Sequence, residues 1–148
     1  MVDLNIPEQN IEIKSINSKN YIFDLIRKKH LILTPEEWVR QNLVSYFIND
    51  LNYPKGLIKT ESSLKYNNLK KRSDILIYNN DMTHYMIVEC KSYKMKLNKS
   101  HLNQSAMYNK IYRSRYLMVS NGMEHIVCEY DWEKETFKFR SSIPEFSF

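Results

Sequence analysis

Glycine is scarce in this chain of 148 residues, which has only Gly56 and Gly122. A phosphate-binding P-loop needs two glycines five positions apart followed by a lysine, and a dinucleotide-binding loop needs three glycines within six positions. Two widely separated glycines satisfy neither pattern. The sequence therefore excludes both motifs, and we expect no nucleotide cofactor.

Cysteine, histidine and long apolar runs are equally limited. Cys90 and Cys128 form no Cys-x-x-Cys pair, and the four histidines show no metal-binding spacing, so a familiar zinc site is not expected. The N-terminus lacks the basic start and apolar run of a signal peptide. No segment approaches the 18 apolar residues that a membrane span needs. We expect a soluble, cytoplasmic protein that does not bind membranes.

Positive charge is concentrated in the middle of the sequence. The net charge is +5, but residues 59–115 alone carry twelve basic and four acidic residues. Such a basic centre favours a polyanionic partner, most simply a nucleic acid, although a solvated lysine-rich surface would have the same composition. The candidate nucleic-acid contacts are Arg72, Lys94, Lys96, Lys99 and Arg113.

The hydrophobic pattern predicts a mixed α/β (α+β) domain. Alternating and apolar segments predict strands, helical spacing predicts two helices, and Thr34-Pro35 is a typical helix start. The expected elements, in chain order, are a hairpin from strands 10–16 and 21–26, a helix over 34–51, strands 57–66, 73–78 and 84–91, a helix over 98–112 capped by Ser100 or Asn98, strands 116–120 and 125–130, and an edge strand 137–139. Residues 1–148 then form one domain, with an N-terminal extension (1–30), a core (34–120) and C-terminal strands (121–148). Trp38 and Trp132 are expected to pack rather than stack on bases. Arg40 and Gln41 could contact phosphate or face solvent, and we expect them to face solvent.

Two carboxylates and a lysine lie at the ends of a strongly apolar hairpin. If Tyr78 pairs with Tyr85, the register places Asp74 directly opposite Glu89. Glu89 and Lys91 are two residues apart, so their side chains share a face of the strand. Two carboxylates this close repel each other and raise one pKa unless a cation lies between them. The pattern thus predicts a charged cluster at one end of a buried hairpin.

Mg²⁺ or Mn²⁺ suits such a cluster, because hard cations prefer oxygen ligands. Asp74 and Glu89 would bind the metal, and the carbonyl of Cys90 is a third candidate ligand. Lys91 would position an attacking water and stabilise charge on a phosphate. The alternative is a plain cross-strand salt bridge of little energetic weight.

These residues resemble a known family. Asp74 with Glu89-x-Lys91 resembles the PD-(D/E)XK, or restriction-endonuclease-like, nuclease superfamily, and Gln104-x-x-x-Tyr108 resembles the additional motif of its exonuclease-related and helicase-associated branches. The segments 23–29 and 34–41 resemble, more specifically, the N-terminal nuclease domain of the motor (R) subunit of type I restriction enzymes.

The resemblance implies a mixed central sheet flanked by helices and a Mg²⁺-dependent DNA endonuclease with Gln104 and Tyr108 in its active site. It also implies a separate motor or specificity subunit as a partner, and an acid from the first helix near the metal. Glu37 is the candidate, but Thr34-Pro-Glu-Glu also makes it half of a capping box, and Glu36 is equally available. A non-catalytic nucleic-acid-binding or scaffold domain of the same fold is the alternative function.

Overall fold

The computed structural model describes residues 1–66 and 69–147, and the side chains of residues 61–73 lie outside the described part. A six-stranded sheet forms its centre, with spatial order β4-β5-β6-β7-β8-β9. The strands of this central sheet and the helices from residue 35 onward are α1 (Pro35–Asn49), the short 3-10 helix η1 (Lys55–Leu57), β4 (Ile58–Tyr66), β5 (Leu69–Tyr78), β6 (His84–Cys90), α2 (Lys99–Tyr112), β7 (Tyr116–Ser120), β8 (His125–Asp131) and β9 (Thr136–Arg140). Strands β6 and β7 pair in parallel, and α2 forms the crossover connection between them. All other neighbouring strands of this sheet pair antiparallel. The expected mixed α/β architecture is confirmed.

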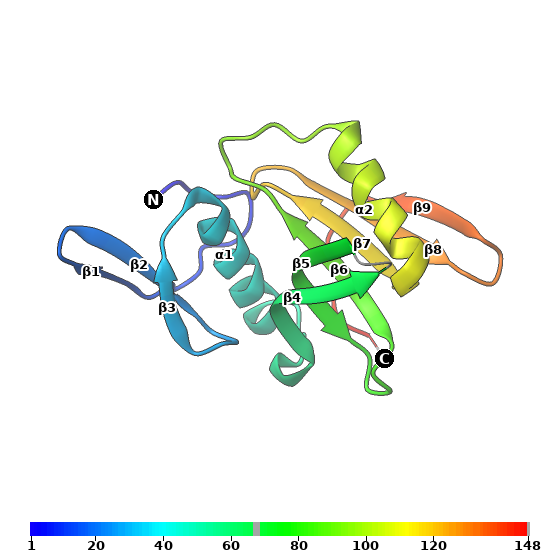
Figure 1. Cartoon of the computed structure of the whole chain (residues 1–148), viewed down its shortest axis with the longest axis horizontal. Coiled ribbons are helices and arrows are strands. Elements are labelled where there is room, and N and C mark those ends of the chain that lie inside the picture. The colour runs from blue at the N-terminus through cyan, green and yellow to red at the C-terminus, as the bar shows by residue number, and fades with distance from the viewer. Residues whose placement is uncertain (67–68, 148) are drawn as a thin grey trace.

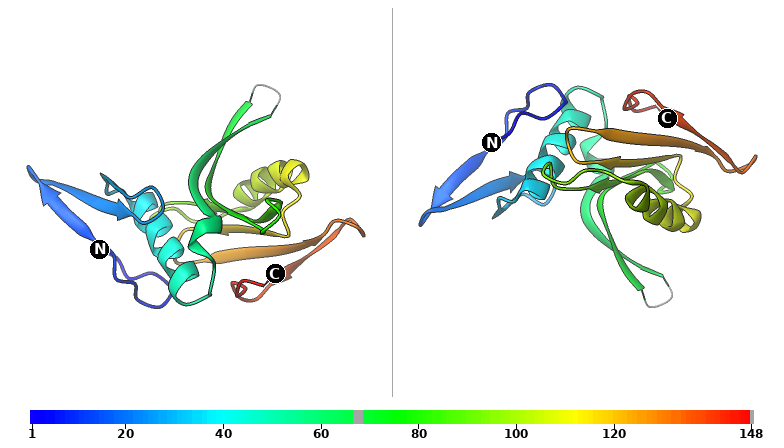
Figure 2. Two further views of the ribbon diagram at one scale, coloured as in Figure 1. Left: turned by 90° about the horizontal axis from the view of Figure 1, so that it is seen from below. Right: turned by 90° about the horizontal axis from the view of Figure 1, so that it is seen from above.

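The two helices lie on opposite sides of the sheet (Figure 2). One apolar cluster joins α1 to alternate residues of the central strands, and includes Leu43, Phe47 and Ile75. A second cluster joins α2 to the residues between them, such as Leu76 and Ile87. Because successive strand residues face opposite sides of a sheet, strands covered on both faces become continuously apolar. This explains the apolar runs on either side of the hairpin turn.

An N-terminal sheet projects away from the central sheet (Figure 1). Its three strands are β1 (Ile13–Ile16), β2 (Lys19–Asp24) and β3 (Lys29–Ile32), in the order β1-β2-β3. The expected hairpin is therefore incomplete, because a third strand follows it. The second turn carries no glycine: Lys28 adopts a left-handed conformation with φ 54°, and the Asp24 carboxylate accepts hydrogen bonds from the backbone N–H groups of Ile26 and Arg27. Such a turn gives no clear signal in the sequence.

The register of the β5–β6 hairpin decides which charged residues meet. Ile75 pairs with Val88, and Ile77 with Met86, which is the predicted register. The predicted partner of Tyr78 is wrong, however, because a bulge pairs Tyr78 with His84 instead. The turn explains this shift, since Met82 is left-handed with φ 69°. The bulge lies at the turn, so the register toward the other end of the hairpin is unaffected.

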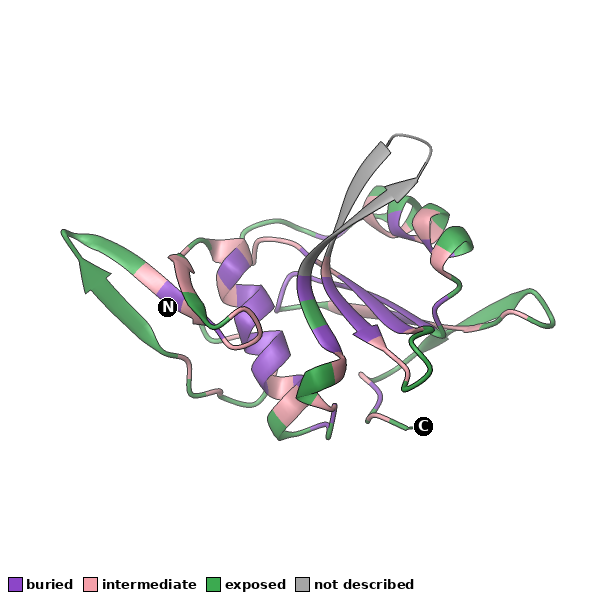
Figure 3. Cartoon of the chain, turned by 60° about the horizontal axis from the view of Figure 1, so that its bottom comes forward, coloured by how far each residue is buried: buried purple, intermediate pink, exposed green. Residues whose placement is uncertain are grey.

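Buried residues concentrate in α1 and the central strands, whereas β1 and the outer part of the β8–β9 hairpin are exposed (Figure 3). Among the described residues, no helix has the length and apolarity to cross a membrane.

Both helices start at the predicted polar caps. Thr34 Oγ1 accepts a hydrogen bond from the Glu37 N–H at 3.0 Å. Asn98 Oδ1 accepts one from the His101 N–H at 3.0 Å, which settles the choice between Asn98 and Ser100 as the cap of α2. These caps satisfy backbone donors that have no partner within the helix.

Asn98→Ala should therefore lower the free energy of unfolding by about 1 kcal/mol, because a first-turn N–H group loses its acceptor. The matched control is Ser100→Ala, an exposed residue of the same turn, which should leave stability unchanged or slightly raised. Urea denaturation followed by circular dichroism measures both. Equal losses in the two variants would contradict the capping role.

Candidate active site

Asp74 lies where β5 passes between the first turns of α1 and the end of β6. Its Oδ1 atom accepts a hydrogen bond from Arg40 Nη2 at 2.9 Å, and its Oδ2 atom accepts one from the Cys90 N–H at 2.8 Å. Burial is the largest influence on the carboxyl and raises its pKa; Arg40 and the Cys90 N–H oppose this rise, and Glu89 adds to it. The carboxylate repulsion predicted from the sequence is therefore present, but it is secondary to burial.

Glu89, on the strand beside that of Asp74, contacts the second helix. Its Oε1 atom lies 3.2 Å from Lys91 Nζ, and its Oε2 atom accepts a hydrogen bond from the Ser105 hydroxyl of α2. The Lys91 N–H donates to the Ser120 carbonyl at 2.8 Å, which fixes this residue beside the end of β7. Lys91 thus points toward Glu89, in agreement with their predicted common face.

Helix α1 contributes two further acids from its first turn. The Glu37 N–H donates to Thr34 Oγ1 of the helix cap, while the Glu37 carboxylate, which the capping box would use, accepts hydrogen bonds from Arg40 Nη1 at 2.7 Å and Gln41 Nε2 at 2.9 Å. Glu36 is more exposed and lies 3.6 Å from Arg40. Its pKa is raised, first by burial and next by Asp74. Both helix acids therefore belong to the cluster.

Arg40 joins these groups, and the expectation that it faces solvent is wrong. It is 4% exposed and contacts Glu37 and Asp74. Gln41 is fully buried, so the same expectation is wrong there. The available signal was the spacing: an arginine three and four residues after two glutamates lies on their face of a helix. What the sequence could not reveal is that this face meets β5.

The helix residues Gln104 and Tyr108 are placed differently from Ser105. Gln104 is exposed and makes no side-chain hydrogen bond with the described residues, and Tyr108 is half-buried. Ser105, one position further along α2, is the residue that contacts Glu89. A single step along a helix rotates the side chain by roughly 100°, so α2 presents Ser105 to the cluster instead of Gln104. No feature of the sequence distinguished Ser105.

The predicted nucleic-acid contacts lie on the surface as far as the structure describes them. Lys94, Lys96, Lys99 and Arg113 are exposed, whereas the side chain of Arg72 lies outside the described residues. A cleft of about 580 Å³ opens between the N-terminal sheet and α1. Its lining includes Arg27, His30, Glu36, Glu37 and Arg40. The α1 residues of the charged cluster are therefore accessible from the side of the N-terminal sheet.

The charge and chemistry of the cluster suit a hard divalent cation. Among the described side chains, four carboxylates meet two cations, Arg40 and Lys91, which leaves two negative charges. No group of three or more His, Cys, Asp or Glu side chains there could hold a metal by itself. Mg²⁺, however, commonly binds through one or two carboxylates and retains several waters. Asp74 and Glu89 are the two carboxylates that would have to meet that requirement, and the Cys90 thiol is buried in the apolar cluster beside α1.

Comparison with known proteins places the chain in a family. Residues 35–144 match the family described as type I restriction enzyme R protein N terminus. The chain belongs to this family. No curated protein matches it.

A solved structure has a similar fold. It is described as the fragment structure of a putative HsdR subunit of a type I restriction enzyme from Vibrio vulnificus YJ016, with a TM-score of 0.53 and 18% sequence identity. The match covers 76% of this chain and 24% of that one, so this chain spans about a quarter of its length. At this identity the likeness concerns the fold.

Replacing Arg40 by methionine should lower the free energy of unfolding by about 3 kcal/mol at pH 7, because the carboxylates of Glu37 and Asp74 lose a buried counterion. The deficit should shrink between pH 7 and pH 4. The pKa of Asp74 is already raised and rises further without Arg40, so the folded variant gains protons as the pH falls.

The matched control is Arg140→Met, which removes a more exposed partner of Glu129 and should cost less than about 1 kcal/mol. Chemical denaturation at several pH values measures both variants. A deficit for Arg40→Met that stays constant or grows toward pH 4 would contradict the role assigned to Arg40.

Proposed function

We propose that this domain is a metal-dependent nuclease that hydrolyses phosphodiester bonds of DNA. The observations that support the proposal are that Lys91 Nζ lies 3.2 Å from the Glu89 carboxylate and that Asp74 accepts a hydrogen bond from the N–H of Cys90, the residue between Glu89 and Lys91. Membership of the R-protein N-terminal family supports a restriction context. The basic centre of the sequence supports a polyanionic substrate.

In this proposal Asp74 and Glu89 hold Mg²⁺ or Mn²⁺, and the carbonyl of Cys90 is a further candidate ligand. When bound, the metal supplies a polarised phosphoryl oxygen and a more acidic water. Lys91 donates a hydrogen bond to the attacking water and stabilises negative charge that develops on the phosphate. Ser105 holds the Glu89 carboxylate from α2, and the exposed lysines 94, 96 and 99 contact the phosphates around the site. Gln104 and Tyr108 stay candidates for contact with bound DNA.

The wider assignment follows from the family. The Vibrio fragment is described as part of a subunit of a type I restriction enzyme, and we propose that the present protein works in the cytoplasm with a separate motor or specificity subunit. The alternative is a non-catalytic DNA-binding domain of the same fold. The contact between Arg40 and Asp74 favours this alternative, because it already supplies a cation to the first carboxylate.

Asp74→Asn and Lys91→Ala should both reduce plasmid nicking by at least a hundredfold, but for different reasons. Asp74→Asn removes a carboxylate ligand, so Mn²⁺ affinity should fall along with the rate. Lys91→Ala leaves both carboxylates in place and removes a competing positive charge. It should therefore bind Mn²⁺ at least as tightly while the rate is lost.

Calorimetric Mn²⁺ titration beside a nicking assay, with and without EDTA, separates the two functions. Lys14→Ala, an exposed lysine of β1, is the control and should nick like the wild type. Mn²⁺ binding without any nicking by the wild type would favour the non-catalytic alternative. Wild-type nicking by Lys91→Ala would overturn the assignment of roles.

A further inference from the structure

An exposed aromatic surface lies away from the charged cluster, at the outer edge of the central sheet. Phe137 and Phe139 of β9 are 58% and 62% exposed. They are two residues apart on an edge strand and therefore face the same side. Tyr130 pairs with Phe137, and Cys128 with Phe139; Cys128 belongs to the apolar cluster beneath α2. Both phenylalanines therefore lie on the α2 side of the sheet, beyond the area that the helix covers.

The base of this surface is a rigid aromatic stack. The rings of Tyr130 and Trp132 are nearly parallel, with an interplanar angle of 7° and centroids 4.8 Å apart. Trp132 donates a hydrogen bond to the Ser114 carbonyl, and the guanidinium of Arg113 lies 4.9 Å from its ring centroid. Trp132 thus packs, as predicted, and the rings that present area to solvent are those of Phe137 and Phe139.

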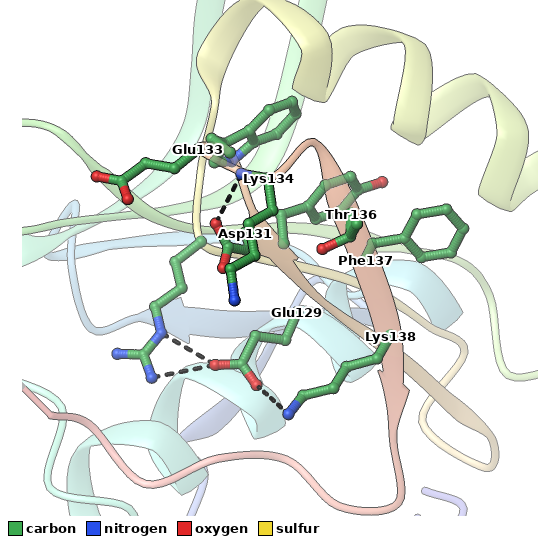
Figure 4. A pocket seen from close by; sticks show the side chains of 10 residues that line it. Glu129, Asp131, Glu133, Lys134, Thr136, Phe137 and Lys138 are labelled. Atoms are coloured by element: carbon green, nitrogen blue, oxygen red, sulfur yellow. Dashed lines mark hydrogen bonds and ion pairs between the residues drawn. The ribbon is translucent and has the colours of Figure 1, made fainter.

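The opposite side of the hairpin has a different character. Glu129 there pairs with Arg115, Lys138 and Arg140. Figure 4 shows Lys138 directed toward Glu129, while Phe137 points away from this charged group. Lys138 and Arg140 of β9 thus both pair with Glu129 on one side of the strand, and the aromatic rings occupy the other.

The helix beside the aromatic surface carries no acidic residue. From Cys90 to Met123 the sequence contains seven lysines and arginines and neither aspartate nor glutamate. A cleft of about 470 Å³ connects the end of α2 to the aromatic rings. It is lined by Lys110 and Arg113 on the helix side and by Tyr130, Trp132 and Phe137 on the hairpin side, with Glu135 as its one acid among the described residues.

We propose that this surface binds single-stranded nucleic acid, with unpaired bases stacked on Phe137 and Phe139 and phosphates held by Lys110 and Arg113. Exposed aromatic rings beside a basic track are the usual means of binding a single strand without sequence preference. In a duplex the bases are stacked on one another, so they cannot stack on these aromatic rings. The proposal rests on the proposed function only in taking DNA as the partner, since the surface does not include the Asp74–Glu89 cluster.

The experiment is fluorescence anisotropy of a labelled oligothymidylate, titrated with the full chain in EDTA at low salt. The wild type should bind, and the double variant Phe137→Ala/Phe139→Ala should bind at least tenfold more weakly, because stacking on an aromatic ring contributes strongly per base. Phe139→Trp should retain binding. Lys110→Gln should weaken binding moderately and reduce the salt dependence by about one phosphate contact.

Two controls make the result specific. Ile32→Ala removes an equally exposed apolar side chain from the N-terminal sheet and should bind like the wild type. The double variant should bind Mn²⁺ and nick like the wild type, which separates this surface from the nuclease site: a failure of nicking leaves oligothymidylate binding intact, and a failure of oligothymidylate binding leaves Mn²⁺ binding and nicking intact. Because both phenylalanines are exposed, the double variant should keep the wild-type melting temperature.

Three results would overturn the proposal. One is the absence of oligothymidylate binding by the wild type at low salt. Another is unchanged affinity in the double variant. The third is a wild type that is dimeric by light scattering and a double variant that is monomeric, which would make the aromatic surface an interface between two copies of the chain.

Discussion

The carboxylate of Asp74, whose side chain is only 13% exposed, is the group around which the candidate site of this domain is organised. A carboxylate removed from water is strongly destabilising unless donors or cations surround it. Arg40 and the Cys90 N–H meet that need from two different elements, α1 and β6. The first turns of α1 must therefore lie against the end of the β5–β6 hairpin. That position brings Glu36 and Glu37 to the same cluster.

The need of Asp74 for a cationic partner also means that Arg40 competes with a divalent cation for the same carboxylate. Arg40 contacts both Asp74 and Glu37, so each of these carboxylates already has a cationic partner within the protein. A divalent cation that binds Asp74 must share the carboxylate with a guanidinium that is already in contact with it. Lys91 likewise forms an ion pair with Glu89, so a cation bound to Glu89 must share that carboxylate with the lysine. The four acids and two basic side chains of the cluster are thus held by contacts within the protein. The cluster still has an excess of negative charge that would attract a metal ion.

Sequence reasoning recovered the parts of this arrangement that depend on local pattern. The α1 and α2 caps, the central strands and the β5–β6 register over residues 75–77 follow from periodicity and turn chemistry. It missed β3, whose turn depends on a left-handed lysine and an aspartate cap. It also placed Arg40 at the surface.

The errors in the site have a common cause. Whether Arg40 is solvated, and whether Gln104 or Ser105 faces Glu89, depends on how each helix is rotated against the sheet. Both helices have polar residues around most of their circumference, so their hydrophobic pattern fixes that rotation poorly. The edge strand at 137–139 was predicted, but the exposure of Phe137 and Phe139 was not, because the alternation of a strand does not show which of its faces another element covers.

The most direct test is the anomalous diffraction of crystals of this protein soaked in Mn²⁺. A metal-dependent nuclease site at this position predicts an anomalous peak within coordination distance of both the Asp74 and Glu89 carboxylates, with Lys91 beside it and the Arg40–Asp74 contact lengthened. An Arg40–Asp74 pair that persists unchanged, with no peak between the two carboxylates, would contradict it.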